Sequence, residues 1–166
     1  MNLLALITLV ALSADGAPVL DAPLETSTGR KVTLASLWGK PAVFFYEDKD
    51  SVLLNLKLKQ DLAARAGDRG WTDKLSVIAV ANVSSWNWFP AKGFVLSAVR
   101  DAEKKTHVPV YLDFEGSITR PPWRLSGNGS TVMVFDAHGT PLRTWSGKLN
   151  DADFEALSGV LEPLIR

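Results

Sequence analysis

The sequence predicts an α/β fold in which a central mixed β-sheet is flanked by helices. Two patterns lead to this prediction. In the first part of the chain, short apolar segments alternate with amphipathic ones, which is typical of strands joined by crossover helices. In the last part, two strand-like segments flank a turn and precede an amphipathic helix. Parallel strands from the first part and a hairpin from the second would together form a mixed sheet.

The alternating part begins with an apolar strand predicted at 42–47 (AVFFYE). A helix is predicted at 51–66, because leucines recur on one face from Leu54 onwards. Residues 75–83 (LSVIAVANV) are almost continuously apolar, as expected for a central parallel strand that is covered on both faces. A second amphipathic helix is predicted at 94–105 and a short strand at 108–114.

The last part of the chain predicts a β-hairpin and a C-terminal helix. The strands are expected at 131–136 and 142–145, on either side of the turn sequence DAHG. Its glycine, Gly139, suits a turn because glycine adopts positive φ most easily. Asn150 then suits the N-cap of the last helix, and the acidic residues that follow it are favoured by the helix dipole.

Composition excludes several classes of function. The 166 residues suit one domain, and 18 basic residues balance 18 acidic ones to give a formal net charge of +0. The basic residues are scattered, so no nucleic-acid partner is predicted. The chain has no cysteine, which excludes disulfides, thiolate metal sites and a lipid-anchored cysteine. The GNG sequence at 127–129 precedes a strand rather than a helix, so no phosphate-binding loop and no cofactor is predicted.

The N-terminus predicts export. Residues 3–12 (LLALITLVAL) are largely apolar but too few to cross a bilayer, which takes about 20 residues. Small residues follow, so we predict a signal peptide over residues 1–14 and a single domain over residues 15–166. The protein would then be periplasmic or secreted, with no stable membrane span after cleavage. The alternative is an N-terminal strand or helix that packs on the domain.

Two longer stretches resemble a known fold. The sequences APLETSTGRKVTLASLWGKPAVFFY and STVMVFDAHGTPLRTWSG are similar to the opening and to the hairpin of thioredoxin-like proteins, in the branch of secreted thiol oxidoreductases and peroxiredoxins. The resemblance covers roughly residues 17–165. More narrowly, the chain resembles the YtfJ-type periplasmic family in PPWRLSGNGSTVMVFDAHG, in the helix at Asn55 and in the long loop after VIAVANV.

The resemblance also indicates where the redox site of such proteins would lie. It aligns Asp50 and Leu53 with the two cysteines of the Cys-x-x-Cys motif, and Ser130 with the cis-proline. Asp50 would then cap the helix that follows, and the peptide bond before Ser130 would be trans. A carboxylate cannot exchange a disulfide. The resemblance therefore implies the scaffold of these enzymes without their thiol chemistry.

Three carboxylates stand close together after the first central strand. Glu47, Asp48 and Asp50 would lie at the carboxyl end of that strand, where ligands bind in open α/β sheets. They are candidates for a cation site, although Ca²⁺ needs about six to eight oxygen ligands. The alternative is that they are solvated and cap the turn, so no metal is assigned.

Aromatic residues follow the second central strand. Trp86, Trp88 and Phe89 lie in the loop SSWNWFPAKG, and Trp123 lies in RPPWRL. All four are expected at the same end of the sheet as the acidic turn. Aromatic residues in loops either cover the edge of a core or form a contact surface. Both alternatives stay open, and the second makes these four residues a candidate binding face.

The sequence favours a non-catalytic binding or protein-interaction module with an unidentified protein or peptide partner. Two alternatives remain. The first is an antioxidant or thiol-oxidoreductase-related enzyme that uses an unidentified residue, because the wider family contains such enzymes. The second is cation binding at the acidic turn. Whether the protein is an enzyme stays open, although the missing cysteines count against it.

Overall fold

The computed structural model describes residues 20–165. The signal peptide predicted at 1–14 lies outside these residues. The strands are β1 (Pro23–Glu25), β2 (Lys31–Thr33), β3 (Ala42–Glu47), β4 (Ser76–Asn82), β5 (Val110–Asp113), β6 (Ser130–Phe135) and β7 (Pro141–Ser146). The helices are α1 (Leu56–Asp68), α2 (Ala91–Thr106) and α3 (Asp151–Leu161), with short 3₁₀ segments η1 (Leu34–Leu37), η2 (Ser84–Trp86), η3 (Ser117–Thr119) and η4 (Glu162–Leu164).

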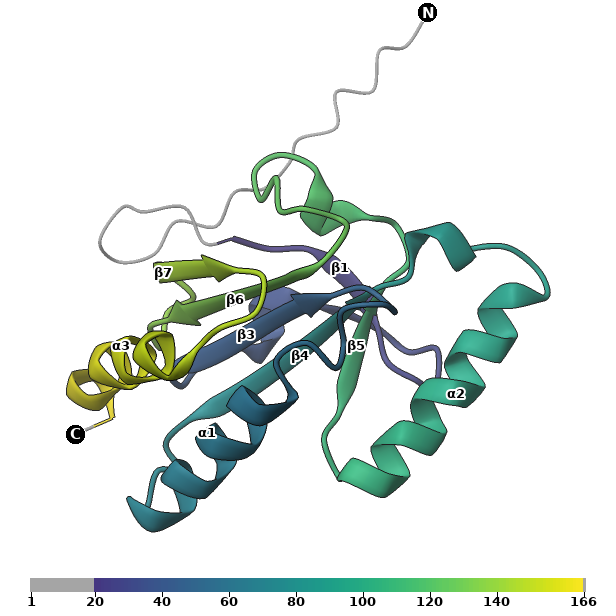
Figure 1. Ribbon diagram of the computed structural model, residues 1–166. Coiled ribbons are helices and arrows are strands. Elements are labelled where there is room, and N and C mark those ends of the chain that lie inside the picture. The colour runs from purple at the N-terminus through teal and green to yellow at the C-terminus, as the bar shows by residue number, and fades with distance from the viewer. Residues whose placement is uncertain (1–19, 166) are drawn as a thin grey trace, which may run out of the picture.

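The seven strands form one sheet in the order β2-β1-β5-β4-β3-β6-β7 (Figure 1). Strands β3, β4 and β5 run parallel, whereas β6 is antiparallel to β3 and β7 is antiparallel to β6. The mixed α/β sheet expected from the sequence is therefore confirmed. Glu47 pairs with Ala81 on β4 and with Ser130 on β6. The ends of β3 and β4 and the start of β6 thus meet at one edge of the sheet.

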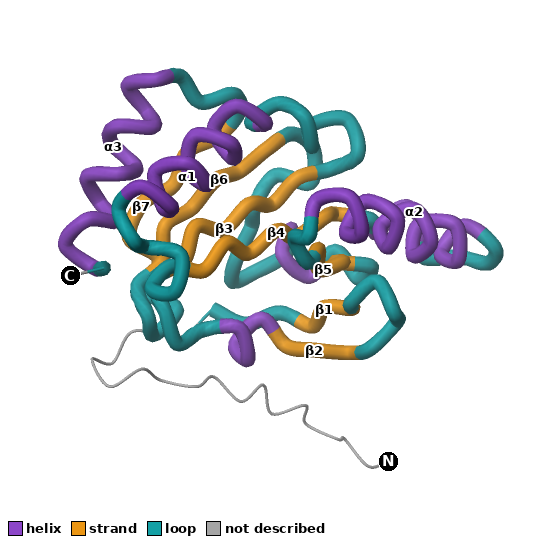
Figure 2. The backbone as a smooth tube through the Cα atoms, turned by 90° about the horizontal axis from the view of Figure 1, so that it is seen from below, coloured by secondary structure: helices purple, strands orange, loops and turns teal. Residues whose placement is uncertain are grey.

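Helices α1 and α3 pack on the same face of the sheet. Figure 2, turned by 90° from Figure 1, shows both helices on one side of the strands. Side chains alternate along a strand, so Val43 and Phe45 of β3 point to this face. They pack against Leu58 and Leu62 of α1 and against Phe154, Leu157 and Leu161 of α3. The capping box of Asn150 and Asp153 fixes the start of α3, as its sequence predicts.

The opposite face is covered by η1 and by the long segment between β5 and β6. Phe44 and Tyr46 of β3 point to this face and pack with Leu34, Ile118 and Trp123. The Tyr46 hydroxyl donates to the buried Asp113 carboxylate at 3.0 Å. Burial, and then the nearby Asp113 charge, raise the pKa of Tyr46, so its hydroxyl stays protonated and can serve as this donor.

The helix predicted at 51–66 begins later, at Leu56. Before it, the chain makes successive turns, in which Leu54 N–H donates to the Ser51 carbonyl and Leu56 N–H to the Leu53 carbonyl. These i→i+3 bonds are tighter than those of an α-helix and leave no continuous apolar face. The expected cap, Asp50, therefore lies in a turn and not at the start of α1.

Strand β4 is less covered than its sequence predicts. Ile78 and Val80 are buried on one face, but Val77 on the other face is exposed. Helix α2 follows β4 and buries only Ala91. Within residues 20–165, no helix is long and apolar enough to cross a membrane.

Candidate functional site

A hydrogen-bonded network of polar side chains is buried where β3, β6 and α1 meet. The Glu47 carboxylate accepts from the Ser130 hydroxyl at 2.9 Å through Oε1 and from Lys59 Nζ through Oε2. The Ser130 hydroxyl in turn accepts from the Asn55 side-chain amide at 2.9 Å. Glu47, Ser130 and Asn55 are all buried. A buried carboxylate is tolerated only when it is paired and hydrogen-bonded, and both conditions are met here.

Asn55 extends this network to the segment that follows β7. Its amide nitrogen also donates to the Gly147 carbonyl at 2.8 Å, and its Oδ1 accepts from the Leu149 backbone N–H at 2.9 Å. The Asn55 side chain therefore joins the start of α1 to the segment between β7 and α3. We call Glu47, Asn55, Lys59 and Ser130 the polar staple.

Asp48 and Ser51 close the turn that follows β3. The Ser51 N–H donates to Asp48 Oδ1 at 2.9 Å, and the Asp48 N–H donates to Ser51 Oγ at 3.0 Å. Hydrogen bonding from the Ser51 side chain, supported by the backbone N–H of Gly129 and by those of Ser51 and Asp50, holds the pKa of Asp48 below its usual value. Asp48 therefore caps the turn that follows β3, whereas among the described residues no side chain caps α1, whose N-cap residue is Asn55.

The three positions aligned with a redox site have different surroundings. Ser130 is buried in the polar staple, whereas Asp50 and Leu53 lie on the surface of the turn, and Leu53 is 71% exposed. The cis peptide bonds among the described residues precede Pro90 and Pro122, so the bond before Ser130 is trans.

The acidic turn does not bring its carboxylates together around one point. The Glu47 carboxylate accepts hydrogen bonds from Lys59 and Ser130, and the Asp48 carboxylate accepts one from the Ser51 N–H. Asp50 is exposed. Among residues 20–165, no group of three or more histidine or acidic residues could hold a metal ion. Nothing in this arrangement favours cation binding.

Large apolar side chains are exposed at the same edge of the sheet. Phe89 is 94% exposed and Trp88 is 57% exposed in the loop after β4, and Phe94 is 72% exposed at the start of α2. Lys49 Nζ lies 5.9 Å from the ring centroid of Trp86, which links this loop to the turn after β3. We call the whole set the edge patch: Val52, Leu53, Leu54, Leu56, Trp86, Trp88, Phe89 and Phe94.

Hydrogen bonds fix the loop that carries the aromatic residues. The Trp88 indole N–H donates to the Ser85 carbonyl at 3.1 Å, and the Trp86 N–H donates to the Val83 carbonyl at 2.9 Å. The Lys92 N–H at the start of α2 donates to the Trp88 carbonyl at 2.9 Å. The aromatic side chains are therefore held in an exposed position by ordered backbone, which lowers the entropy that binding would cost.

Trp123 does not belong to this surface. It is 7% exposed, its ring stacks on Phe44 at 5.6 Å, and its indole N–H donates to the Asp21 carbonyl at 3.0 Å. Its apolar ring fills the core on the face that no long helix covers. Including Trp123 in the candidate binding face was therefore wrong, whereas Trp86, Trp88 and Phe89 are exposed as that hypothesis requires.

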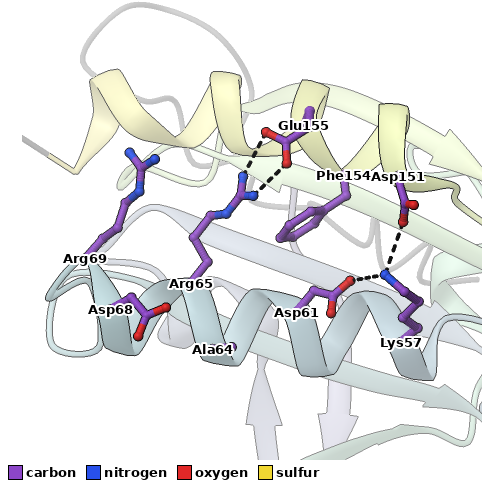
Figure 3. A pocket seen from close by; sticks show the side chains of 9 residues that line it. All are labelled: Lys57, Asp61, Ala64, Arg65, Asp68, Arg69, Asp151, Phe154 and Glu155. Atoms are coloured by element: carbon purple, nitrogen blue, oxygen red, sulfur yellow. Dashed lines mark hydrogen bonds and ion pairs between the residues drawn. The ribbon is translucent and has the colours of Figure 1, made fainter.

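A second surface feature is a groove of about 530 Å³ between α1 and α3 (Figure 3). Several of the charged side chains that line it form ion pairs, two of which join α1 to α3. Lys57 bridges Asp61 and Asp151, and Arg65 binds Glu155 with both terminal nitrogens at 3.0 and 2.6 Å. Such matched charges join the helices and leave few free groups for a ligand.

Several solved structures are similar to this chain. A proposed thiol:disulfide interchange protein DsbE from Chlorobium tepidum is 18% identical with a TM-score of 0.63, over 89% of this chain and 95% of that one. The exposed lipoprotein thioredoxin Etrx1 from Streptococcus pneumoniae is 19% identical with a TM-score of 0.59, over 87% and 100%. A proposed protein disulfide isomerase from Bacteroides thetaiotaomicron is 19% identical with a TM-score of 0.59, over 95% and 91%.

This chain has a thioredoxin-like fold. The fold expected from the sequence resemblance is thereby confirmed, and the chain carries it without any cysteine. No family model matches the sequence, and no curated protein sequence matches it. The narrower resemblance to the YtfJ-type family and the alignment of Asp50, Leu53 and Ser130 with a redox site stay predictions.

Sequence reasoning missed Lys59 and the joint role of the polar staple. The staple links residues far apart in the sequence, which no local pattern connects. It also missed that Val52, Leu53 and Leu54 are exposed together. The sequence held a signal for this, because three consecutive apolar residues cannot all lie on the buried face of one helix.

The polar staple should make Ser130 and Asn55 energetically coupled. Ser130→Ala should lower the free energy of unfolding by about 1–3 kcal/mol, because buried groups of Glu47 and Asn55 lose a partner. The Ser130→Ala/Asn55→Ala double variant should lose less than the sum of the single losses, by about 0.5 kcal/mol or more, because the two residues share a bond. Urea unfolding measures all three variants.

Ser97→Ala serves as the control, because Ser97 is exposed on α2 and its change should stay within about 0.5 kcal/mol. Strictly additive losses, or a Ser130→Ala variant as stable as Ser97→Ala, would show that the staple does not act as a unit.

Proposed function

We propose that this protein is an exported, non-catalytic binding module of the thioredoxin-like fold, formed as one domain by residues 15–166. It binds an apolar segment of another polypeptide chain at the edge patch. The observation that carries this proposal is the exposure of large apolar side chains on ordered backbone at the edge where β3 and β4 end. Soluble monomers rarely expose an apolar patch of more than a few hundred Å² unless it binds something.

The polar staple supports a role without redox chemistry. Thiol–disulfide exchange needs a thiolate, and this chain has no cysteine to supply one. At the edge where a thiol site is expected, Ser130 and Glu47 are bonded to each other and shielded from solvent. These groups stabilise the junction of three elements and are not free to attack a substrate.

A polypeptide partner is favoured over a small molecule. One similar structure is named as a proposed protein disulfide isomerase, and such a name describes a protein that acts on other polypeptide chains. Another is named as a proposed thiol:disulfide interchange protein. The edge patch is built from aromatic and aliphatic side chains, and Trp is enriched among the residues that dominate protein interfaces. The groove between α1 and α3 has its charges paired internally and is the weaker candidate.

Export is the second part of the proposal. It is supported by the apolar run at 3–12 with small residues after it, and one similar structure is named as an exposed lipoprotein. N-terminal sequencing of the exported protein should find a start near Ala14 or Asp15. Exported protein that still begins at Met1 would contradict the signal-peptide assignment.

The binding role predicts that Trp88→Ala weakens peptide binding without unfolding the protein. Fluorescence anisotropy with the best binders from an array of apolar peptides should show about a thirtyfold loss, equivalent to about 2 kcal/mol. Thermal melting should change little, because Trp88 is more than half exposed. The matched control is Leu142→Ala, which removes an exposed apolar side chain on β7 and should leave the affinity unchanged.

Three results would count against the proposal. The first is a loss of stability of about 3–5 kcal/mol in Trp88→Ala, as expected for a residue that covers a core. The second is equal weakening by Leu142→Ala. The third is reduction of insulin disulfides by the protein above the background rate with dithiothreitol, since this would indicate an enzyme.

A further inference from the structure

The edge patch is large enough to form half of a protein–protein interface. Aromatic side chains contribute about 150–250 Å² each when they are covered. From their exposed fractions, the eight residues of the patch leave on the order of 700 Å² of apolar surface open. A stable interface of standard size buries about 800 Å² on each partner. The patch therefore matches what one subunit of a dimer contributes.

The charges beside the patch are self-complementary. Lys49 and Asp50 are adjacent in the turn after β3, and neither forms an ion pair within residues 20–165. The contact of Lys49 is with the Trp86 ring, inside the patch. In a two-fold symmetric dimer every contact occurs twice: if residue i of the first copy contacts residue j of the second, then residue j of the first copy contacts residue i of the second. Lys49 of one copy can therefore pair with Asp50 of the other, twice in the same interface.

The whole chain also favours self-association over repulsion. Its formal net charge is +0, so two copies meet without a long-range electrostatic barrier. Hydrogen bonds fix the aromatic loop, and the Asp48–Ser51 pair fixes the turn, so the two halves of the patch need little ordering on contact.

We propose that the edge patch binds a second copy of this chain, forming a two-fold symmetric dimer in which Lys49 of each copy pairs with Asp50 of the other. This inference rests on the same surface as the proposed function. Dimer formation covers the apolar side chains when no peptide is bound. A polypeptide partner must then displace the second copy, so peptide binding and dimerisation exclude each other.

Sedimentation velocity of the purified exported protein, from about 1 to 100 μM, tests the dimer. The wild-type protein should change from monomer to dimer over this range. Phe89→Ser should raise the dissociation constant at least about tenfold, because it removes the most exposed apolar side chain of the patch. Leu142→Ser should leave the dissociation constant unchanged, because it removes an exposed apolar residue on β7.

Charge reversal tests the geometry of the contact. Lys49→Asp and Asp50→Lys should each weaken the dimer about tenfold, because each brings like charges together across the two-fold axis. The double variant Lys49→Asp/Asp50→Lys restores the pairing with reversed signs and should return the dissociation constant to within about threefold of the wild type. Addition of an apolar peptide that binds should shift the protein towards monomer.

A protein that stays monomeric at about 100 μM would overturn the inference, as would a dimer that Phe89→Ser does not weaken. A double variant as weak as the single variants would also overturn it. The proposed function can fail separately. A monomer that still binds apolar peptides would retain the function and lose the dimer, whereas a dimer that no peptide dissociates and that binds none would retain the dimer and lose the function.

Discussion

The burial of the Glu47 carboxylate is the constraint on which the site depends. Glu47 ends the central strand β3, where water is excluded, so its charge requires partners within the protein. Ser130 supplies one from β6 and Lys59 supplies another from α1. Asn55 then connects this pair to the segment before α3. One buried charge therefore fixes the relative positions of two strands and two helices at the edge where the sequence resemblance predicts a redox site.

The staple also accounts for the apolar surface. Because Asn55 is held inward at the start of α1, the residues before it cross the edge of the sheet in tight turns. Leu53 and its neighbours consequently point to solvent, and Lys49 in the same turn contacts Trp86 of the exposed aromatic loop after β4. At this edge of the sheet, the buried side chains are therefore polar and hydrogen-bonded, whereas the exposed side chains of the edge patch are apolar. The proposed recognition of an apolar chain requires such an arrangement.

Local sequence patterns predicted the strands of the sheet well. The features that depend on contacts between distant residues were not predicted. The strand at 42–47 and the Asn150 cap were found because periodicity and capping are local signals. The predicted start of α1 at residue 51 was wrong, because the Asp48–Ser51 turn competes with helix formation before Leu56. Trp123 was misplaced because the sequence does not show which core an aromatic loop residue fills. The staple could not be predicted, since Glu47 and Ser130 meet only through the pairing of β3 with β6.

The central claim is that the edge patch, and not the groove between α1 and α3, is the binding surface. Amide chemical-shift mapping by NMR during titration with an apolar peptide tests it most directly, because it reports on both surfaces at once. The account predicts that shifts concentrate at 49–56 and 84–94, while Arg65 and Glu155 in the groove change little. Shifts centred on the groove, or no shifts with any apolar peptide, would contradict it.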